Sequence, residues 1–279
     1  MRILVAGATG YLGRFVVAEG VSRGWRVRAL VRDARRAAFS SKVELFEGRA
    51  TETDSLARVA EGVDVVVSSL GITRQTDRVG YAQVDYGGNL ALLREAERAG
   101  ARRFVYVSVL HPEHTRHTDM VREKERFVAE LRASSLSCAV VRPTGFFSDM
   151  APIFEMARGG RVWVFGEGDA EINPIHGADL AELCLDVAAD ERSEVEVGGP
   201  ETFTQRAIAE LAFDVLGKPP KIASLPDWLV GAGLAVTKPL SRRRWNVGAF
   251  VSTVCRRRMV GPAFGRRRLR GFFEERAAG

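Results

Sequence analysis

The first thirteen residues constrain the fold more than any other part of the chain. An apolar run at residues 3–6 leads directly into Gly7, Gly10 and Gly13, spaced G-x-x-G-x-x-G, and a helical pattern follows. This order predicts a strand, a tight turn and a helix. Glycine accepts a positive φ and lets the backbone approach a phosphate, while the helix N-terminus offers N–H groups to it. The pattern predicts a dinucleotide-binding turn with pyrophosphate at residues 10–12, and a purely structural turn is the alternative.

Apolar, β-rich runs alternate with helical patterns through the first half of the chain. The expected strands are residues 3–6, 26–31, 43–46, 65–69, 103–108 and 137–142. The expected helices are residues 11–23, 53–61, 79–99 and 119–133. Segment 85–89, Asp-Tyr-Gly-Gly-Asn, is poor in helix formers, which suggests that contacts other than helix propensity hold it. Strands and helices in this alternation predict an α/β fold of the Rossmann type, with a doubly wound parallel sheet.

The regularity loosens after Pro143, where glycines separate shorter elements. Helical patterns recur at residues 177–189 and 204–216. We therefore expect a nucleotide-binding domain over residues 1–150 and a small C-terminal substrate lobe over residues 151–279. The lobe should be interleaved with the last strands of the sheet.

Composition limits the class of protein and the cellular compartment that we expect. Its 279 residues are 46% hydrophobic and 27% charged, as in globular proteins, and they contain no run of 18 apolar residues that could span a bilayer. The first residues enter a strand and do not resemble a signal peptide. The three cysteines, Cys138, Cys184 and Cys255, are far apart and lie in apolar surroundings. They indicate buried thiols in a reducing compartment, so we expect a cytoplasmic protein.

Residues that follow two of the strands are candidates for cofactor contacts, because ligands of such sheets bind at the carboxyl ends of the strands. Arg32 lies nineteen residues after Gly13, where an acidic side chain would bind the 2′-hydroxyl of NAD. A guanidinium suits a 2′-phosphate, which favours NADP(H) over NAD(H); Asp33 keeps NAD open, and a solvated basic surface is the alternative. Leu70 and Gly71 follow the fourth strand, where small neighbours leave room for adenine and ribose, and ordinary loop punctuation is the alternative.

Four segments occur together in a combination more specific than the glycine turn. They are Gly7-Ala-Thr-Gly-Tyr-Leu-Gly13, Val31-Arg-Asp33, Tyr106-Val-Ser108 with Lys124, and Arg142-Pro-Thr-Gly-Phe-Phe147. Together they resemble the short-chain dehydrogenase/reductase superfamily, and most closely its atypical, NmrA-like branch. Later segments fit as well, at residues 173–179, 197–204, 216–219 and 259–265. The resemblance implies an NAD(P)(H)-dependent oxidoreductase with a small-molecule substrate, whose identity the sequence does not give.

The catalytic set of this superfamily is Ser, Tyr and Lys, with Tyr-x-x-x-Lys about twelve residues after the Ser. Ser108 and Lys124 match this pattern, whereas Met120 stands at the position of the Tyr. The resemblance implies that Ser108 and Lys124 are catalytic, but methionine cannot donate a proton as the phenol does. A second interpretation therefore stays open: a non-catalytic NADP(H)-binding sensor or assembly protein, including one that works at a membrane surface.

The same resemblance places the residues after the sixth strand beside the nicotinamide ring. The expected cofactor contacts come from the glycine turn, from three strand ends and from one helix. They are Gly7, Thr9, Gly10, Tyr11, Leu12, Gly13, Arg32, Leu70, Gly71, Lys124, Pro143, Thr144 and Phe146.

Three histidines at a spacing of three, His111, His114 and His117, follow the fifth strand. A histidine of near-neutral pKa is a competent proton donor, so one of them could replace the missing phenol. The spacing also suggests a metal site, but no cysteine or matching acidic cluster accompanies it. A polar loop near the active site is the third interpretation, and we expect no metal.

The C-terminal part of the chain is strongly basic. Residues 228–273 contain eleven lysines and arginines and no aspartate or glutamate, although the net charge of the whole chain is only +6. Three interpretations stay open: a solvated basic surface, a peripheral contact with an anionic membrane that also uses the apolar run 228–236, and nucleic-acid binding, which we disfavour. The sequence predicts no oligomeric state.

Overall fold

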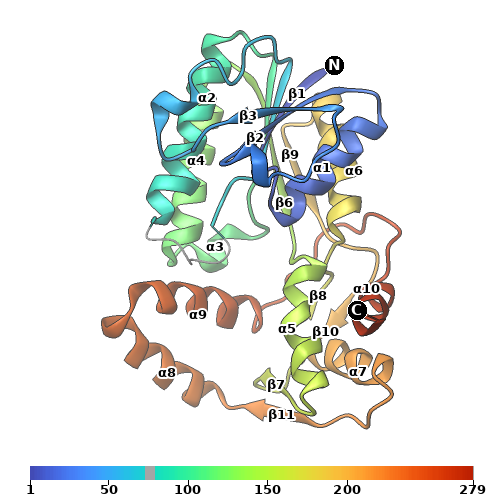
Figure 1. The fold of residues 1–279 in the computed structure, drawn as a ribbon. Coiled ribbons are helices and arrows are strands. Elements are labelled where there is room, and N and C mark those ends of the chain that lie inside the picture. The colour runs from blue at the N-terminus through green and yellow to red at the C-terminus, as the bar shows by residue number, and fades with distance from the viewer. Residues whose placement is uncertain (73–78, 279) are drawn as a thin grey trace. The chain divides into compact units, whose positions relative to one another are not determined.

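The computed structural model describes residues 1–72 and 79–278 and contains a seven-stranded sheet (Figure 1). The order of its strands is β3-β2-β1-β4-β5-β6-β9. Their bounds are β1 (Arg2–Ala6), β2 (Arg26–Val31), β3 (Val43–Glu47), β4 (Val65–Ser68), β5 (Arg103–Val107), β6 (Ser137–Pro143) and β9 (Glu194–Val197). The pairs from β3 through β6 are parallel, and the strand order reverses beside β1. The predicted Rossmann-type fold is confirmed.

Helices lie on both sides of this sheet, with α2 and α4 on one side and α1 and α6 on the other (Figure 1). Their bounds are α1 (Tyr11–Ser22), α2 (Asn89–Arg98), α4 (Asp119–Ala133) and α6 (Gly177–Ala189). All residues of β4 and β5 are buried. This is why these strands are nearly continuous apolar runs rather than alternating ones: a parallel sheet is covered on both faces.

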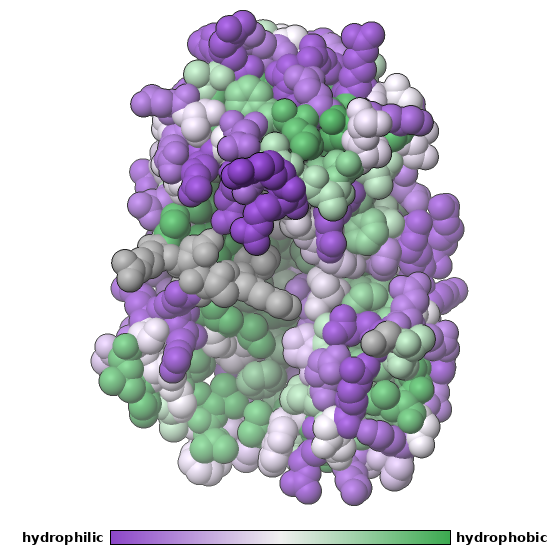
Figure 2. Space-filling view, in the orientation of Figure 1, coloured by the Kyte–Doolittle hydropathy of each residue, from purple (hydrophilic) through white to green (hydrophobic). Residues whose placement is uncertain are grey.

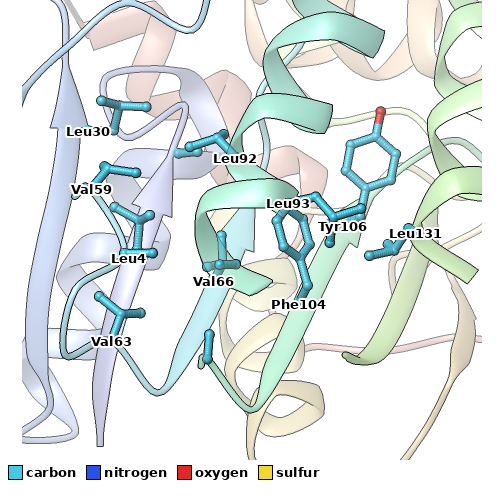
Figure 3. Packing of buried hydrophobic residues seen from close by; sticks show 14 of the residues in the cluster. Leu4, Leu30, Val59, Val63, Val66, Leu92, Leu93, Phe104, Tyr106 and Leu131 are labelled. Carbon is cyan, nitrogen blue, oxygen red and sulfur yellow. The ribbon is translucent and has the colours of Figure 1, made fainter. Parts of the chain in front are cut away.

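The core on the side of α2 and α4 is built from aliphatic side chains of the strands and helices and from two phenylalanines (Figure 3). The rings of Phe104 and Phe127 lie 5.8 Å apart. Tyr106 lies at the edge of this packing, and its phenol oxygen points away from the aliphatic side chains (Figure 3). The core thereby presents one polar atom toward the carboxyl ends of the strands.

Two expected helices differ in the structure. Residues 53–61 form only the short 3₁₀ helix η2 (Thr53–Leu56), because Arg58 takes a φ of 68°, which a helix does not accept. The expected helix at 79–99 divides into a π-helix, η3 (Ala82–Gly88), followed by α2. The π-helix coincides with the segment of poor helix formers. A further 3₁₀ turn, η1 (Ala34–Arg36), follows β2.

The chain forms two compact units. Unit 1 comprises Met1–Val109, Asp119–Arg142 and Leu180–Val195, and unit 2 comprises Leu110–Thr118, Pro143–Asp179 and the residues from Glu196 onward. Unit 2 holds two small sheets, β10 with β8 and β11 with β7. Its elements are α3 (Pro112–Thr115), α5 (Phe147–Arg158), β7 (Val162–Phe165), β8 (Glu171–Ile172), β10 (Phe203–Thr204), α7 (Gln205–Val215), β11 (Ile222–Leu225), α8 (Asp227–Leu240), α9 (Arg242–Val254) and α10 (Leu269–Ala278). The expected domain boundary at residue 150 stays a prediction.

Polar residues of segment 173–179 connect distant parts of unit 2. The buried Asn173 amide donates to the carbonyls of Gly199 (3.0 Å) and Gly261 (2.9 Å). Asp179 accepts backbone N–H bonds from Arg266 and Arg267. These bonds explain the segment as structural, because buried polar groups need partners. None of the helices in the described part of the chain is long and apolar enough to cross a bilayer.

Candidate functional site

The glycine turn joins β1 to α1 and leaves the start of the helix without a side-chain cap. Gly10 is the N-cap residue, and its backbone N–H donates to the Gly7 carbonyl at 2.9 Å. Gly7 has a φ of 77°, and a Cβ at Gly13 would lie 2.0 Å from the Gly7 oxygen. Both positions therefore require glycine. The first turn of a helix carries N–H groups without helical partners and a positive dipole end, so this turn fits a pyrophosphate.

The glycine turn lies against the end of β4. Ser68 pairs with Ala6 in the sheet, and the Ser69 N–H donates to the Ala6 carbonyl at 3.1 Å. A Cβ at Gly7 would lie 2.9 Å from Ser69 Oγ. β1 and β4 are the neighbours at which the strand order reverses, which is where sheets of this class bind their ligands. The structure thus places the glycine turn and the segment that contains Leu70 and Gly71 together.

Arg32 follows the last residue of β2, the strand next to β1, and its side chain is exposed. The neighbouring Asp33 accepts the Arg35 backbone N–H at 2.9 Å and so caps η1. The arginine is at the strand end where the adenosine ribose binds in this fold, while the carboxylate is engaged by its own backbone.

Lys124, on α4, lies between two buried side chains from other elements. Its Nζ is 3.2 Å from Asp85 Oδ1 on η3 and 3.5 Å from the Tyr106 hydroxyl on β5. A Cβ at Gly71 would lie 2.8 Å from the same Nζ and 2.7 Å from Asp85 Oδ1. Gly71 is therefore glycine because the ammonium and the carboxylate lie directly against its backbone. The Lys124 side chain is 12% exposed, whereas the Asp85 side chain is fully buried.

Burial and the neighbouring polar groups together set the protonation of these three groups. It raises the pKa of Asp85 above its usual range, although the Lys124 ammonium opposes this shift. It raises the pKa of Tyr106 to about 12, so the phenol is neutral at physiological pH. Burial disfavours the charge on Lys124, but the Tyr106 oxygen and the Asp85 carboxylate outweigh it and raise the pKa of the lysine. The charged form of Lys124 is therefore favoured at the site.

Asn89 explains how the π-helix is held beside β4. Its amide donates to the Asp85 carbonyl at 2.8 Å and to the Leu70 carbonyl at 3.3 Å. Its Oδ1 accepts the Ser68 hydroxyl at 2.6 Å. A π-bulge of this kind is frequent at functional sites. Here it points Asp85 at Lys124, and the Asp85 Oδ2 accepts the Ile72 N–H at 3.1 Å.

Ser108, which follows β5, belongs to a second buried polar cluster. Its hydroxyl donates to Glu125 Oε1 at 2.9 Å and accepts from Arg142 at 3.4 Å. Arg142 also makes two bonds to Glu125, at 2.7 and 3.0 Å, and one to Glu194 at 2.6 Å. Burial lowers the pKa of Arg142, but these two carboxylates outweigh it and raise the pKa above its ordinary value. The serine hydroxyl is thus held within unit 1 by a paired guanidinium and carboxylate.

The expected contacts after β6 lie in unit 2. Pro143 ends β6, and the Thr144 hydroxyl donates to the Asn173 carbonyl at 2.6 Å. The Phe146 N–H donates to Asp149 Oδ2 at 2.8 Å, and Phe146 is the N-cap residue of α5. Their roles toward a cofactor stay predictions.

Two of the three histidines lie close together in unit 2. Ligand atoms of His111, Glu113 and His114 all lie within 4.8 Å of one another, and His111 takes a left-handed φ of 46°. The third, His117, packs at 6.4 Å from the Trp245 ring instead. The expectation that no metal binds stays a prediction.

Sequence reasoning missed the partners of the two catalytic candidates. Asp85 and Glu125 are acids on helices, and Tyr106 is an aromatic residue in a buried strand, so each fits an ordinary structural pattern. One signal pointed at Asp85: it begins the segment that is poor in helix formers. Met120, which occupies the position of the family tyrosine, lies one turn before Lys124 on α4.

Comparison with known proteins agrees with this geometry. A family model described as NAD(P)H-binding matches residues 7–191. The chain therefore belongs to this NAD(P)H-binding family.

The relatives differ in their described roles. Divinyl chlorophyllide a 8-vinyl-reductase of Arabidopsis thaliana is 30% identical over 270 residues, which cover 85% of this chain and 64% of that protein. This chain thus spans less than two thirds of the length of that relative. Photosystem II assembly factor Ycf39 of Guillardia theta is 28% identical over 236 residues, which cover 81% of this chain and 74% of that protein.

Two solved structures share the fold over almost the whole chain. A nucleoside-diphosphate-sugar epimerase of Staphylococcus aureus has a TM-score of 0.75 at 15% identity and covers 98% of this chain and 100% of its own. NADPH-dependent quinone oxidoreductase QOR2 of Escherichia coli, complexed with NADPH, has a TM-score of 0.71 at 17% identity, covering 99% and 98%.

Proposed function

We propose that the protein is an NADP(H)-dependent oxidoreductase that transfers hydride to or from a small organic molecule. The observation that carries this proposal is the position of the Lys124 ammonium. It lies against Gly71, at the strand end that also contacts the glycine turn. A lysine ammonium there supports binding of the ribose that carries the nicotinamide. A bound nicotinamide would supply or accept a hydride at its ring C4.

We prefer NADP(H) to NAD(H) because of the strand end after β2. Arg32 is exposed there, and a guanidinium binds a phosphate with two charge-assisted hydrogen bonds. Asp33, the group that would favour NAD, is engaged as the cap of η1. The charge and the geometry at this strand end therefore support a 2′-phosphate.

The chemistry of the site favours hydride acceptors that do not need a tyrosine phenol as proton donor. Met120 has no proton to donate, and the raised pKa of Lys124 makes this ammonium a poor acid. Conjugated alkenes and quinones accept hydride into a delocalised system, and water can deliver the proton afterwards. Two of the similar proteins are named as a vinyl reductase and a quinone oxidoreductase, which agrees with alkenes and quinones as hydride acceptors.

Ser108 is the proposed group that polarises the substrate. For this role its hydroxyl must turn away from Glu125. When the hydroxyl rotates, the Glu125 carboxylate keeps its two bonds to Arg142. The rotation therefore leaves no buried charge without a partner. Lys124 is proposed as the second catalytic residue, through its hold on the cofactor.

A second candidate function is supported by Met120 and by the assembly factor among the relatives. In this reading the chain binds NADP(H) and acts as a sensor or assembly protein without turnover. As partners we propose a small-molecule substrate and a peripheral membrane contact through residues 228–279. We propose the cytoplasm as its location.

The deciding experiment is a fluorescence titration with NADPH and NADH, followed by a turnover screen with quinones, activated alkenes and carbonyls. We expect NADPH to bind more tightly than NADH. Lys124→Gln should weaken NADPH binding by about tenfold or more, since a bond to a charged group contributes about 1.5–3 kcal/mol. Lys42→Gln, an exposed lysine after η1, is the control. Weak binding of both nucleotides would overturn the proposal, and tight binding with no turnover would favour the sensor.

The variant Met120→Tyr separates the two functions further. Carbonyl reduction gained by this variant alone would show that the site holds NADPH productively but lacks the acid. If the wild-type protein reduces alkenes or quinones and the variant does so equally well, the phenol is irrelevant to the native reaction.

A further inference from the structure

Two consecutive helices of unit 2, α8 and α9, form a hairpin with an unusual distribution of side chains (Figure 1). α8 is rich in Leu, Val, Ala and Gly, yet none of its residues is buried. Only the stripe formed by Val230, Leu234 and Thr237 is partly covered, and Leu234 faces Gly248 of α9. An apolar helix of a globular protein is normally covered on all sides, so most of the surface of α8 is unpartnered in the described chain.

The opposite face of α8 is apolar and exposed. Trp228 is 73% exposed, Val236 61% and Leu240 78%, and Leu229 lies on the same side. At 100° per residue these positions, together with Ala232 and Ala235, fall on one face of the helix. Figure 2 shows hydrophobic surface gathered in the lower left of the view, the area in which Figure 1 places α8 and α9.

α9 also exposes hydrophobic residues while it buries small or polar ones. It buries Asn246, Ala249 and Ser252, which are small or polar, and it exposes Val247 and Val251 at 39% each. Of the nine large hydrophobic residues that are exposed in the described chain, six belong to this hairpin. An exposed apolar patch of this kind marks an interaction site rather than a solvated surface.

Apart from Asp227 at the start of α8, the charged residues of the hairpin are basic. Lys238 lies in the last turn of α8, and Arg242, Arg243 and Arg244 open α9 on exposed positions. The Lys238 ammonium lies 5.2 Å from the Trp245 ring centroid. No acidic residue occurs between Trp228 and Phe273, so nothing on either helix after Asp227 would repel an anionic surface.

We propose that the α8–α9 hairpin is a docking element for an anionic lipid bilayer, lying in the interface with its apolar face among the acyl chains. This inference deepens the membrane contact proposed above and is independent of the cofactor. An apolar face with a tryptophan and a basic flank is the pattern of interfacial helices, and lysines and arginines add attraction to anionic headgroups. With fourteen residues, α8 is about 21 Å long, too short to span.

Other occupants fit these features less well. Nucleic acid would use the arginines but would leave the Trp, Leu and Val side chains exposed to water. A second copy of the chain packed symmetrically on the same face would bring two clusters of like charge together. In an anionic bilayer the headgroups would contact the basic residues of the hairpin, and the acyl chains would cover its apolar face.

The test is co-sedimentation of the full chain with vesicles of phosphatidylcholine alone and of phosphatidylcholine with phosphatidylglycerol. We expect binding to the anionic vesicles, reduced by salt, and little binding to the neutral ones. Replacing Arg242, Arg243 and Arg244 by Gln should weaken binding about a hundredfold, since each such residue contributes about fivefold near the surface. A triple replacement at Arg35, Arg36 and Lys42 is the charge control and should have little effect.

The apolar half is tested by Trp228→Ala combined with Leu240→Ser. This pair should reduce anionic vesicle binding at least tenfold, whereas Trp163→Ala, a tryptophan of β7 that is 44% exposed, should not. Wild-type tryptophan fluorescence should shift to the blue on anionic vesicles, and Trp228→Phe should lose most of that shift. Far-UV circular dichroism and NADPH binding check that each variant folds.

Three results would overturn the proposal. The first is wild-type protein that binds NADPH but does not sediment with anionic vesicles at low salt. The second is hairpin variants that sediment like the wild type. The third is a concentration-dependent dimer in light scattering that Trp228→Ala abolishes, because a second copy would then cover this face. A protein that binds vesicles but not NADPH would leave this proposal intact and overturn the proposed enzymatic function alone.

Discussion

Lys124 depends on residues that the catalytic motif does not contain. Asp85 neutralises its charge and Tyr106 contributes a neutral oxygen, so the ammonium is held with one side toward the backbone of Gly71. A buried ammonium without such partners would lose its proton. The position and the protonation of Lys124 are therefore properties of the three residues together.

Replacing Asp85 by Asn should make cofactor binding sensitive to pH. Without the carboxylate the pKa of Lys124 should fall, so the lysine loses its charge more readily as the pH rises above neutral, and NADPH binding weakens with it. We expect the wild-type dissociation constant to change much less above neutral pH, because the raised pKa of Lys124 keeps it charged. Fluorescence titrations at several pH values measure this, with Asp64→Asn as control. Parallel pH profiles for both proteins would contradict the role of Asp85.

Glu194 gives the protein a component of its acid sensitivity. Burial alone would raise the pKa of Glu194, but the hydrogen bonds and charges of Arg142 and Arg132 together outweigh it and lower the pKa. Because the folded pKa is the lower one, this stabilisation is present above the unfolded value of about 4.3 and is lost as the pH falls through the folded value. The loss of stability from pH 7 to below pH 4, measured by urea unfolding, should be smaller in Glu194→Gln. Glu196→Gln, on the same strand, should behave like the wild type.

At the scale of elements, the glycine turn has the strictest sequence requirement. A Cβ at Gly13 would overlap the Gly7 carbonyl, whereas a Cβ at Gly271 of α10 meets nothing within 4 Å. Gly13→Ala should destabilise the protein by about 3 kcal/mol or more, since backbone on both sides prevents relaxation. Gly271→Ala should leave stability unchanged or raise it by up to about 1 kcal/mol. Equal melting temperatures of the two variants would contradict this account of the turn.

The π-helix should be the element most sensitive to a single polar deletion. Asn89→Ala removes the acceptor of the buried Ser68 hydroxyl proton and a donor to the Asp85 carbonyl, and a buried polar group that loses its partner costs about 1–3 kcal/mol. It should also weaken NADPH binding, because η3 carries Asp85. The exposed Gln83→Ala on the same element should change stability by no more than about 0.5 kcal/mol. Urea unfolding and NADPH titration of both variants measure the contrast.

Most elements of the sheet domain could be predicted from the sequence. β1, β2, β4, β5 and β6 begin and end within a residue or two of their predicted bounds, because apolar runs between glycines and helical patterns are local signals. The predicted helix at 53–61 and the uninterrupted helix at 79–99 were wrong. In both places a backbone conformation decided the outcome, the left-handed Arg58 and the π-helix. Side-chain periodicity does not report such conformations.

For the whole molecule, cofactor binding should appear as thermal stabilisation. At a concentration one hundred times its dissociation constant, a ligand adds about 2.7 kcal/mol, which raises the melting temperature of a chain of this size by about 5 °C or more. We expect NADPH to produce a larger shift than NADH at equal concentration. Arg32→Glu should remove this difference, and Arg35→Glu, an exposed arginine of η1, should keep it. A larger shift with NADH in the wild type would contradict the assignment of Arg32.

The sequence by itself determined the Rossmann-type sheet, the glycine turn and the candidates Ser108 and Lys124, because strand, turn and helix signals act over short stretches of chain. Only the tertiary structure decided which groups surround those candidates. Tyr106 and Lys124 are 18 positions apart and Arg142 and Glu194 are 52 apart, and such pairs meet only when strands and helices pack. The tertiary structure likewise decided that the apolar face of α8 is exposed, since periodicity predicts an apolar face but not whether the fold supplies a partner to cover it.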